Sequence, residues 1–106
     1  MSRGLKEKFL SDLLKGGLLH PLLDRVKADK SLCLELRDDY VNVYYRGGNL
    51  LRLSRTTQGY VPSFDVKYFR GEGPAAELPN LVREPNDIAS WLGALPRLKQ
   101  AMDVYP

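Results

Sequence analysis

Asp65 and Lys67 have the spacing that comes closest to a catalytic pattern. Residues two apart in a strand share one face, and several metal-dependent nucleases use an acid and a lysine at this spacing. The carboxylate holds the metal and the lysine positions the attacking water. Glu35, Asp38 or Asp39 could supply the second acid from a neighbouring strand. Polar strand faces often contain such a tripeptide, so we favour a solvent-facing ion pair and expect no catalysis within these residues.

Tyrosine is frequent in the part of the sequence that we predict to form a sheet. Tyr40 and Tyr44 share one face of the segment 40–45, opposite Val41 and Val43, which we expect to face the core. The two tyrosines are then half-exposed. Aromatic residues on an open sheet face, interleaved with basic residues, can stack nucleic-acid bases. The alternative is a face that binds a protein partner or is partly covered.

Four basic residues accompany these tyrosines and could bind phosphates: Arg46, Arg52, Arg55 and Lys67. If the protein contacts nucleic acid, we expect them to converge on one exposed face and binding to depend strongly on salt. The segment 46–49 (RGGN) could also form an anion-binding loop. A hairpin turn explains Gly47 and Gly48 equally well, and we favour it.

Composition narrows the range of functions. The chain has 106 residues and a formal net charge of +3, which fits a single domain over 1–106 with mild attraction to acidic partners. His20 is the only histidine and Cys33 the only cysteine, so we expect no disulfide within the chain, no metal and no cofactor. No apolar run reaches the roughly 20 residues of a membrane span, and Glu7 and Asp12 interrupt the first segment. We therefore expect a cytoplasmic protein with no membrane partner.

The apolar pattern first follows a helical period and then a strand period. It predicts one helix from an N-cap at Ser2 to a stop at Gly16-Gly17, and a second from about 21 to 27. Four strands follow, over 32–37, 40–45, 50–56 and about 63–69, joined by turns at 38–39, 47–49 and 58–59. Short connections of this kind predict an antiparallel β-meander.

The C-terminal part combines a loop with a helix. Glycines and prolines between 70 and 85 predict a long loop. Asn86 is the expected N-cap of a helix that continues to about Met102, and Pro96 predicts a kink or a division into two helices. The predicted fold is therefore α+β: a four-stranded antiparallel meander with two N-terminal helices and a kinked C-terminal helix packed on one face.

Three segments resemble the N-terminal region of a group of uncharacterised bacterial proteins. They are 34–52 (LELRDDYVNVYYRGGNLLR), 64–69 (FDVKYF) and 98–103 (LKQAMD). In longer members of that group, the following region is similar to the PD-(D/E)xK nuclease superfamily. The resemblance implies that this chain is a leading module without the nuclease core, so it assigns no catalytic residue here. The end of the chain directly after a helix also suggests one domain of a longer protein.

Three functions remain open from the sequence. The first is a non-catalytic accessory domain of a nuclease-like protein that contacts nucleic acid. The second is a protein-interaction or self-association module, acting through exposed tyrosines or an open sheet edge as a homodimer or with another protein. The third is a small metal-dependent enzyme that uses Asp65 and Lys67 with Glu35, which we rank well behind the others.

Overall fold

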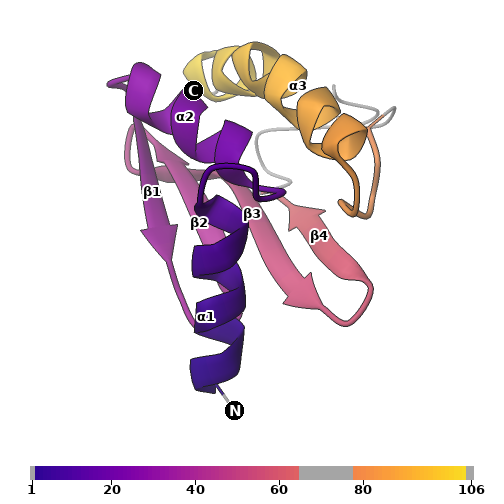
Figure 1. The fold of residues 1–106 in the computed structure, drawn as a ribbon. Helices are drawn as coiled ribbons and strands as arrows, with labels where there is room; N and C mark the ends of the chain where they lie inside the picture. The colour runs from indigo at the N-terminus through magenta and orange to yellow at the C-terminus, as the bar shows by residue number, and fades with distance from the viewer. Residues whose placement is uncertain (1, 65–77, 105–106) are drawn as a thin grey trace.

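A four-stranded antiparallel sheet and three helices make up the described part of the chain (Figure 1). The structure, a computed structural model, describes residues 2–64 and 78–104. The elements are α1 (Ser2–Leu13), α2 (His20–Ala28), β1 (Leu32–Leu36), β2 (Tyr40–Tyr45), β3 (Gly48–Thr56), β4 (Gly59–Ser63) and α3 (Pro85–Asp103). The strands are hydrogen-bonded in the order β1-β2-β3-β4. The predicted α+β meander is thus confirmed.

One face of the sheet carries the hydrophobic core. Val41, Val43, Leu51 and Leu53 are almost completely buried there, because alternate side chains of a strand point to the same side. Side chains from all three helices join them in a single cluster, among them Phe9 of α1, Leu22 of α2, and Ile88, Trp91 and Leu95 of α3. In Figure 1, α1 crosses in front of the sheet, and α2 and α3 lie over its upper end. The prediction that the valine face of β2 is the core is confirmed.

A β-bulge interrupts the pairing of β2 with β3. Val43 is opposite Leu51 and Tyr44 is opposite Asn49, so Leu50 is an extra residue on β3. Leu50 and Leu51 are both fully buried, although neighbours in a regular strand point to opposite faces. The bulge therefore brings two consecutive leucines into the core.

The hairpin between β2 and β3 turns one residue earlier than predicted. Arg46 has φ 55° and Gly47 has φ 79°, and Gly48 is already paired with Tyr45. Two positive φ values between paired residues are typical of the two-residue turns that match strand twist. The turn thus consists of Arg46 and Gly47, and β3 begins at Gly48 rather than at Leu50.

The predicted fourth strand was misplaced along the chain. β4 spans Gly59–Ser63 and pairs with β3 from Thr56↔Gly59 to Arg52↔Ser63. The turn was predicted at 58–59, whereas Gly59 is already the first residue of β4. Pro62 lies in this outer strand, where a missing N–H is tolerated. Tyr60 also exchanges two backbone hydrogen bonds with Val82, of 2.9 and 2.7 Å. Residues 65–69 of the predicted strand lie outside the described part of the chain.

Helix α3 is continuous from Pro85 to Asp103, with Pro96 inside it. The helix therefore begins one residue before the expected N-cap, Asn86. The backbone N–H groups of Arg83 and Glu84 donate to Oδ2 of Asp87 at 2.9 and 3.0 Å. A carboxylate in the first turn accepts from these donors and is stabilised by the helix dipole. The alternative of two separate helices is wrong.

Pro96 leaves a carbonyl of α3 without its helical partner, because proline has no N–H to donate to residue i−4. That residue is Leu92, and Nη1 of Arg25 in α2 donates to its carbonyl oxygen at 3.1 Å. A second link joins the same helices, since Nζ of Lys99 donates to Oδ2 of Asp29 at 2.7 Å. The two polar contacts fix α2 against α3 beside their apolar contact.

Candidate functional site

The face of the sheet opposite the core carries a cluster of polar side chains from three strands, here called the open-face cluster. Its members are Glu35 of β1, Arg37 directly after β1, Tyr40, Asn42 and Tyr44 of β2, and Arg52 of β3. The register places Glu35 and Arg52 on either side of Asn42. Among the described residues, the helices pack on the other face. The predicted half-exposure of Tyr40 and Tyr44 is confirmed.

Asn42 is the centre of the open-face cluster and is only 1% exposed. Its Oδ1 accepts a hydrogen bond of 2.7 Å from Nε of Arg52. Its Nδ2 donates to Oε1 of Glu35 and to the hydroxyl of Tyr44, both at 3.1 Å. A buried amide is costly unless it is hydrogen-bonded, and these contacts satisfy it. The neighbouring side chains are thereby held in fixed positions.

Glu35 accepts hydrogen bonds from other members of the open-face cluster. Its Oε1 accepts from the Tyr44 hydroxyl at 2.9 Å, and its Oε2 accepts from Nη2 of Arg37 at 2.8 Å. The hydrogen bonds from Asn42, then Tyr44 and Arg37, lower the pKa of Glu35. Its carboxylate in turn raises the pKa of the Tyr44 hydroxyl. At neutral pH the pair is therefore a carboxylate with a neutral phenol.

Tyr40 and Arg52 form a cation–π pair at the other end of the cluster. The guanidinium carbon of Arg52 lies 4.1 Å from the centroid of the Tyr40 ring. The hydrogen bond from Arg52 to Asn42 fixes the guanidinium in this position. An arginine beside an aromatic ring offers both a positive charge and a planar surface.

Arg46 does not belong to this cluster. Its Nη1 lies 2.8 Å from Oδ1 of Asp103 at the end of α3, which also accepts the hydroxyl of Tyr45 at 2.7 Å. The hydrogen bonds from Tyr45 and Arg46 lower the pKa of Asp103. Arg46 thus ties the β2–β3 turn to the C-terminal helix.

Arg55 lies on the side of the sheet opposite Arg52, because the two residues are three positions apart along one strand. It is paired with Tyr60, which is 1% exposed and packs on Phe9 of α1 with ring centroids 5.5 Å apart. Arg46, Arg52 and Arg55 therefore do not converge, contrary to the expectation for a shared phosphate-binding face. Lys67 lies outside the described residues.

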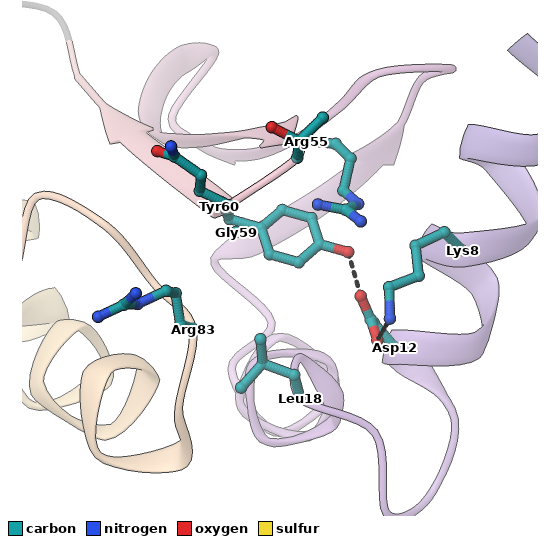
Figure 2. Close-up of a pocket in the computed structure, with 9 residues that line it drawn as sticks. Lys8, Asp12, Leu18, Arg55, Gly59, Tyr60 and Arg83 are labelled. Atoms are coloured by element: carbon teal, nitrogen blue, oxygen red, sulfur yellow. Dashed lines mark hydrogen bonds and ion pairs between the residues drawn. The ribbon is translucent and has the colours of Figure 1, made fainter.

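Arg55 lines a pocket between α1, the β3–β4 turn and the segment before α3 (Figure 2). The cavity volume is about 190 Å³. The Tyr60 hydroxyl donates to Oδ2 of Asp12, and Nζ of Lys8 lies 3.2 Å from Oδ1 of the same carboxylate. Burial, and then the hydrogen bond to Asp12, raises the pKa of Tyr60 far above its usual range. Tyr60 is thus a permanently neutral donor in this wall.

The described part of the chain shows no metal site for the alternative of a metal-dependent enzyme. Asp65 and Lys67 lie outside it, and Asp38 and Asp39 are exposed between β1 and β2. Glu35 is engaged by Arg37, Asn42 and Tyr44 as described above. Within residues 2–64 and 78–104, no group of three His, Cys, Asp or Glu side chains could hold a metal ion.

Among the described residues, the side chain of His20 contacts a carboxylate and a backbone carbonyl, and its Nε2 lies 3.3 Å from Oδ2 of Asp24 in α2. Nδ1 of His20 donates to the carbonyl oxygen of Leu13 at 2.8 Å and so joins α1 to α2. Cys33 is exposed on the open face beside Tyr44. His20 is thus the first residue of α2, and Cys33 is a free thiol at the surface.

Comparisons with known proteins found no match: no family model, no curated protein and no solved structure matches the chain. The resemblance to uncharacterised bacterial proteins therefore stays a prediction. None of the helices described is long and apolar enough to cross a membrane.

Sequence reasoning missed the residues that organise both sites. Asn42 was visible as a polar residue between Tyr40 and Tyr44, but its burial depends on side chains from β1 and β3. Asp12 and Tyr60 are 48 positions apart, and only the packing of α1 on β4 brings them together. The separation of Arg52 from Arg55, by contrast, follows from strand alternation alone.

Proposed function

We propose that this chain is a non-catalytic module that binds single-stranded nucleic acid on the open-face cluster. The observation that carries the proposal is the pairing of Tyr40 with Arg52, at 4.1 Å, on a sheet face that the described helices leave open. Single-stranded bases stack on aromatic rings and on guanidinium planes, and such stacking needs no particular sequence.

The hydrogen bonds around Asn42 support this proposal because they hold the binding groups in place before a ligand arrives. Arg52 is fixed by Asn42, and Tyr44 is fixed by Glu35. Side chains that are already ordered lose less conformational entropy on binding. The open-face cluster thus offers rigid planar groups rather than flexible charged ones.

The charge of the cluster limits the expected affinity. Arg37, with a side chain 57% exposed, and Arg52 are available to phosphates, while Glu35 opposes them. Two phosphate contacts would give a slope of about −1.4 for log K against log salt with a single strand. We therefore expect weak binding with a shallow salt dependence, and a preference for single strands over duplexes.

Fluorescence anisotropy with a labelled oligothymidylate and a labelled duplex tests the proposal. Titrations at about 50 and about 200 mM salt cover the range over which salt weakens phosphate contacts. Tyr40→Ala and Arg52→Gln should each weaken binding of the single strand by about tenfold, the loss of one stacked base or charged contact. Arg97→Gln removes an exposed charge from α3 and should leave binding unchanged. An equal effect of Arg97→Gln, or no binding by the folded protein, would exclude this function.

A second candidate function is docking of a second copy of the chain on the same face. The observation that favours it is Val61 of β4, which is 40% exposed and lies on the open face beside Ser54 and Tyr40. Glu35 and the two arginines would then form ion pairs across the two-fold axis. Sedimentation velocity over a range of concentrations tests this: a dimer that Val61→Asp dissociates supports docking, and a monomer at every concentration excludes it.

A further inference from the structure

The pocket around Arg55 is a second candidate binding site, separate from the open face. Three segments that are distant in sequence form it: α1, the β3–β4 turn and the residues before α3. Its volume of about 190 Å³ is smaller than the roughly 300 Å³ at which pockets for drug-sized ligands begin. The pocket therefore suits a small ion or one functional group of a larger molecule.

Positive charge predominates in the walls of this pocket. Lys8, Arg55 and Arg83 line it together with one carboxylate, Asp12. That carboxylate is already engaged by Lys8 and by the Tyr60 hydroxyl. Figure 2 shows the guanidinium of Arg55 beside the Tyr60–Asp12 pair, and the guanidinium of Arg83 directed away from that pair. An anion would therefore meet Arg55 and Lys8.

Arg55 has a hydrogen-bond donor that the described residues leave unused. Its Nη1 donates to the carbonyl oxygen of Thr56, which fixes the plane of the guanidinium. Its Nε is buried and makes no hydrogen bond within the described part of the chain. A buried donor without an acceptor is costly, and more so when it is charged. The edge that carries Nε is also the edge with which arginine binds carboxylates and phosphates through two parallel hydrogen bonds.

We propose that this pocket binds a small oxyanion, either a phosphate group or a carboxylate, between Arg55 and Lys8. The oxyanion supplies the missing acceptor for Nε of Arg55 and a second partner for the ammonium of Lys8. The Tyr60 hydroxyl and Asp12 form the floor and hold Lys8 over it. Since α1 and β3 provide the two cations, the bound anion joins these elements and stabilises the folded state.

Thermal unfolding and two-dimensional NMR of the full chain, titrated with inorganic phosphate or acetate against sodium chloride at matched ionic strength, test this site. We expect a saturable rise in melting temperature, with chemical-shift changes confined to α1 and the β3–β4 turn. Saturation by phosphate alone identifies phosphate groups as the ligand, and saturation by acetate alone identifies carboxylates. Equal stabilisation by all three salts, or shifts elsewhere, would overturn the proposal.

Variants separate this site from the open face. Arg55→Gln should weaken anion binding by about tenfold, as expected for one lost charge-assisted hydrogen bond. Arg55→Lys keeps the charge but removes the paired donors, so it should also weaken binding and guards against a folding defect in the first variant. Arg52→Gln should leave anion binding intact while weakening oligonucleotide binding. Unchanged binding in both Arg55 variants would refute the assignment.

Discussion

The hydrogen bond between Tyr60 and Asp12 shows how one residue pair can contribute to the stability of the fold. Both side chains are at least nine-tenths buried, and Lys8 adds a third partner at 3.2 Å. The Tyr60 hydroxyl is a neutral donor to this buried carboxylate, and the Tyr60 ring packs on Phe9. Without it, Oδ2 of the buried Asp12 side chain would lose its hydrogen-bond donor, which is costly.

Tyr60→Phe removes this donor while it keeps the ring. We expect a loss of about 1–3 kcal/mol in the free energy of unfolding, the usual effect of leaving a buried acceptor unsatisfied. Urea unfolding followed by circular dichroism measures it. Tyr44→Phe on the half-exposed face is the matched control and should cost less. Equal losses in the two variants would show that burial of Asp12 is unimportant.

Asp29 gives the protein a defined sensitivity to acid. Hydrogen bonds from Lys99 and then from Ser31 hold the pKa of Asp29 at about 2. Because the folded pKa is lower than that of the unfolded chain, the contribution of this group is complete above about pH 4, the unfolded pKa of aspartate. It is lost as the pH falls toward 2.

We therefore expect Lys99→Met to reduce the fall in stability of the wild-type protein between about pH 4 and pH 2. Urea midpoints measured at intervals over this range provide the test. Arg97→Met, two positions earlier on the exposed side of α3, is the control and should retain the wild-type slope. A slope that Lys99→Met leaves unchanged would contradict the assignment of Asp29.

The helices illustrate how elements depend on one another. Pro96 interrupts the hydrogen bonds of α3, and Arg25 of α2 donates to the carbonyl oxygen of Leu92 that the interruption leaves free. The carbonyl oxygen that Pro96 leaves free in α3 is thus a hydrogen-bond acceptor for a side chain of α2.

A double-mutant cycle tests this dependence. Arg25→Met alone should lower the free energy of unfolding by about 1–3 kcal/mol, because it leaves the Leu92 carbonyl without a donor. In a Pro96→Ala background, the restored N–H of residue 96 supplies that donor, so the same substitution should cost clearly less. Chemical denaturation of the four proteins gives the coupling energy. Additive effects would mean that Arg25 does not act through this carbonyl.

The turn into β4 depends on a glycine for a steric reason. Gly59 has φ 142°, and a Cβ there would lie 2.6 Å from the carbonyl oxygen of Val82. That carbonyl accepts the backbone N–H of Tyr60.

Gly59→Ala should lower the free energy of unfolding by about 1–3 kcal/mol and weaken the bridge between Tyr60 and Val82. Thermal unfolding reports the first effect, and the amide shifts of Tyr60 and Val82 report the second. Gly47→Ala is the comparison, since its φ of 79° is also positive but its Cβ would meet no atom within 4 Å. An equal loss in both variants would show that backbone conformation alone, and not the close approach to Val82, is responsible.

The sequence predicts elements well where the pattern is local and uninterrupted. β2 was predicted with its observed bounds because Tyr40–Tyr45 has no breaker and alternates cleanly. β4 was misplaced because Gly59 was assigned to a turn, whereas the pairing with β3 makes it the first residue of the strand. The same limit applies to the sites: the face of Tyr40 and Tyr44 was predictable, whereas the pocket requires α1 and β4 to meet.

At the scale of the whole molecule, stability should be unevenly distributed. β2 is hydrogen-bonded on both sides, to β1 and β3, and carries four buried residues. α1 lies across the sheet, and from residue 7 to its end it buries only Phe9, Asp12 and Leu13.

Hydrogen exchange should therefore show α1 opening at a lower free energy than β2. If the pocket binds an oxyanion, added phosphate should slow exchange in α1 and leave β2 unchanged. Mass spectrometry of exchanged peptides resolves both regions. Protection that is uniform from α1 to β2 would mean that the molecule opens as one unit.

The bulge at Leu50 also determines where the chain can change in length. Loss of one residue from a regular strand turns every following side chain to the wrong face. Here the residues on both sides of Leu50 are already paired in register with Val43 and Tyr44. A deletion of Leu50 therefore shortens β3 to an uninterrupted ladder and costs one buried leucine, but it leaves the orientation of Arg52 and Leu53 intact. This is a position in the sheet where a natural or engineered gap would be tolerated.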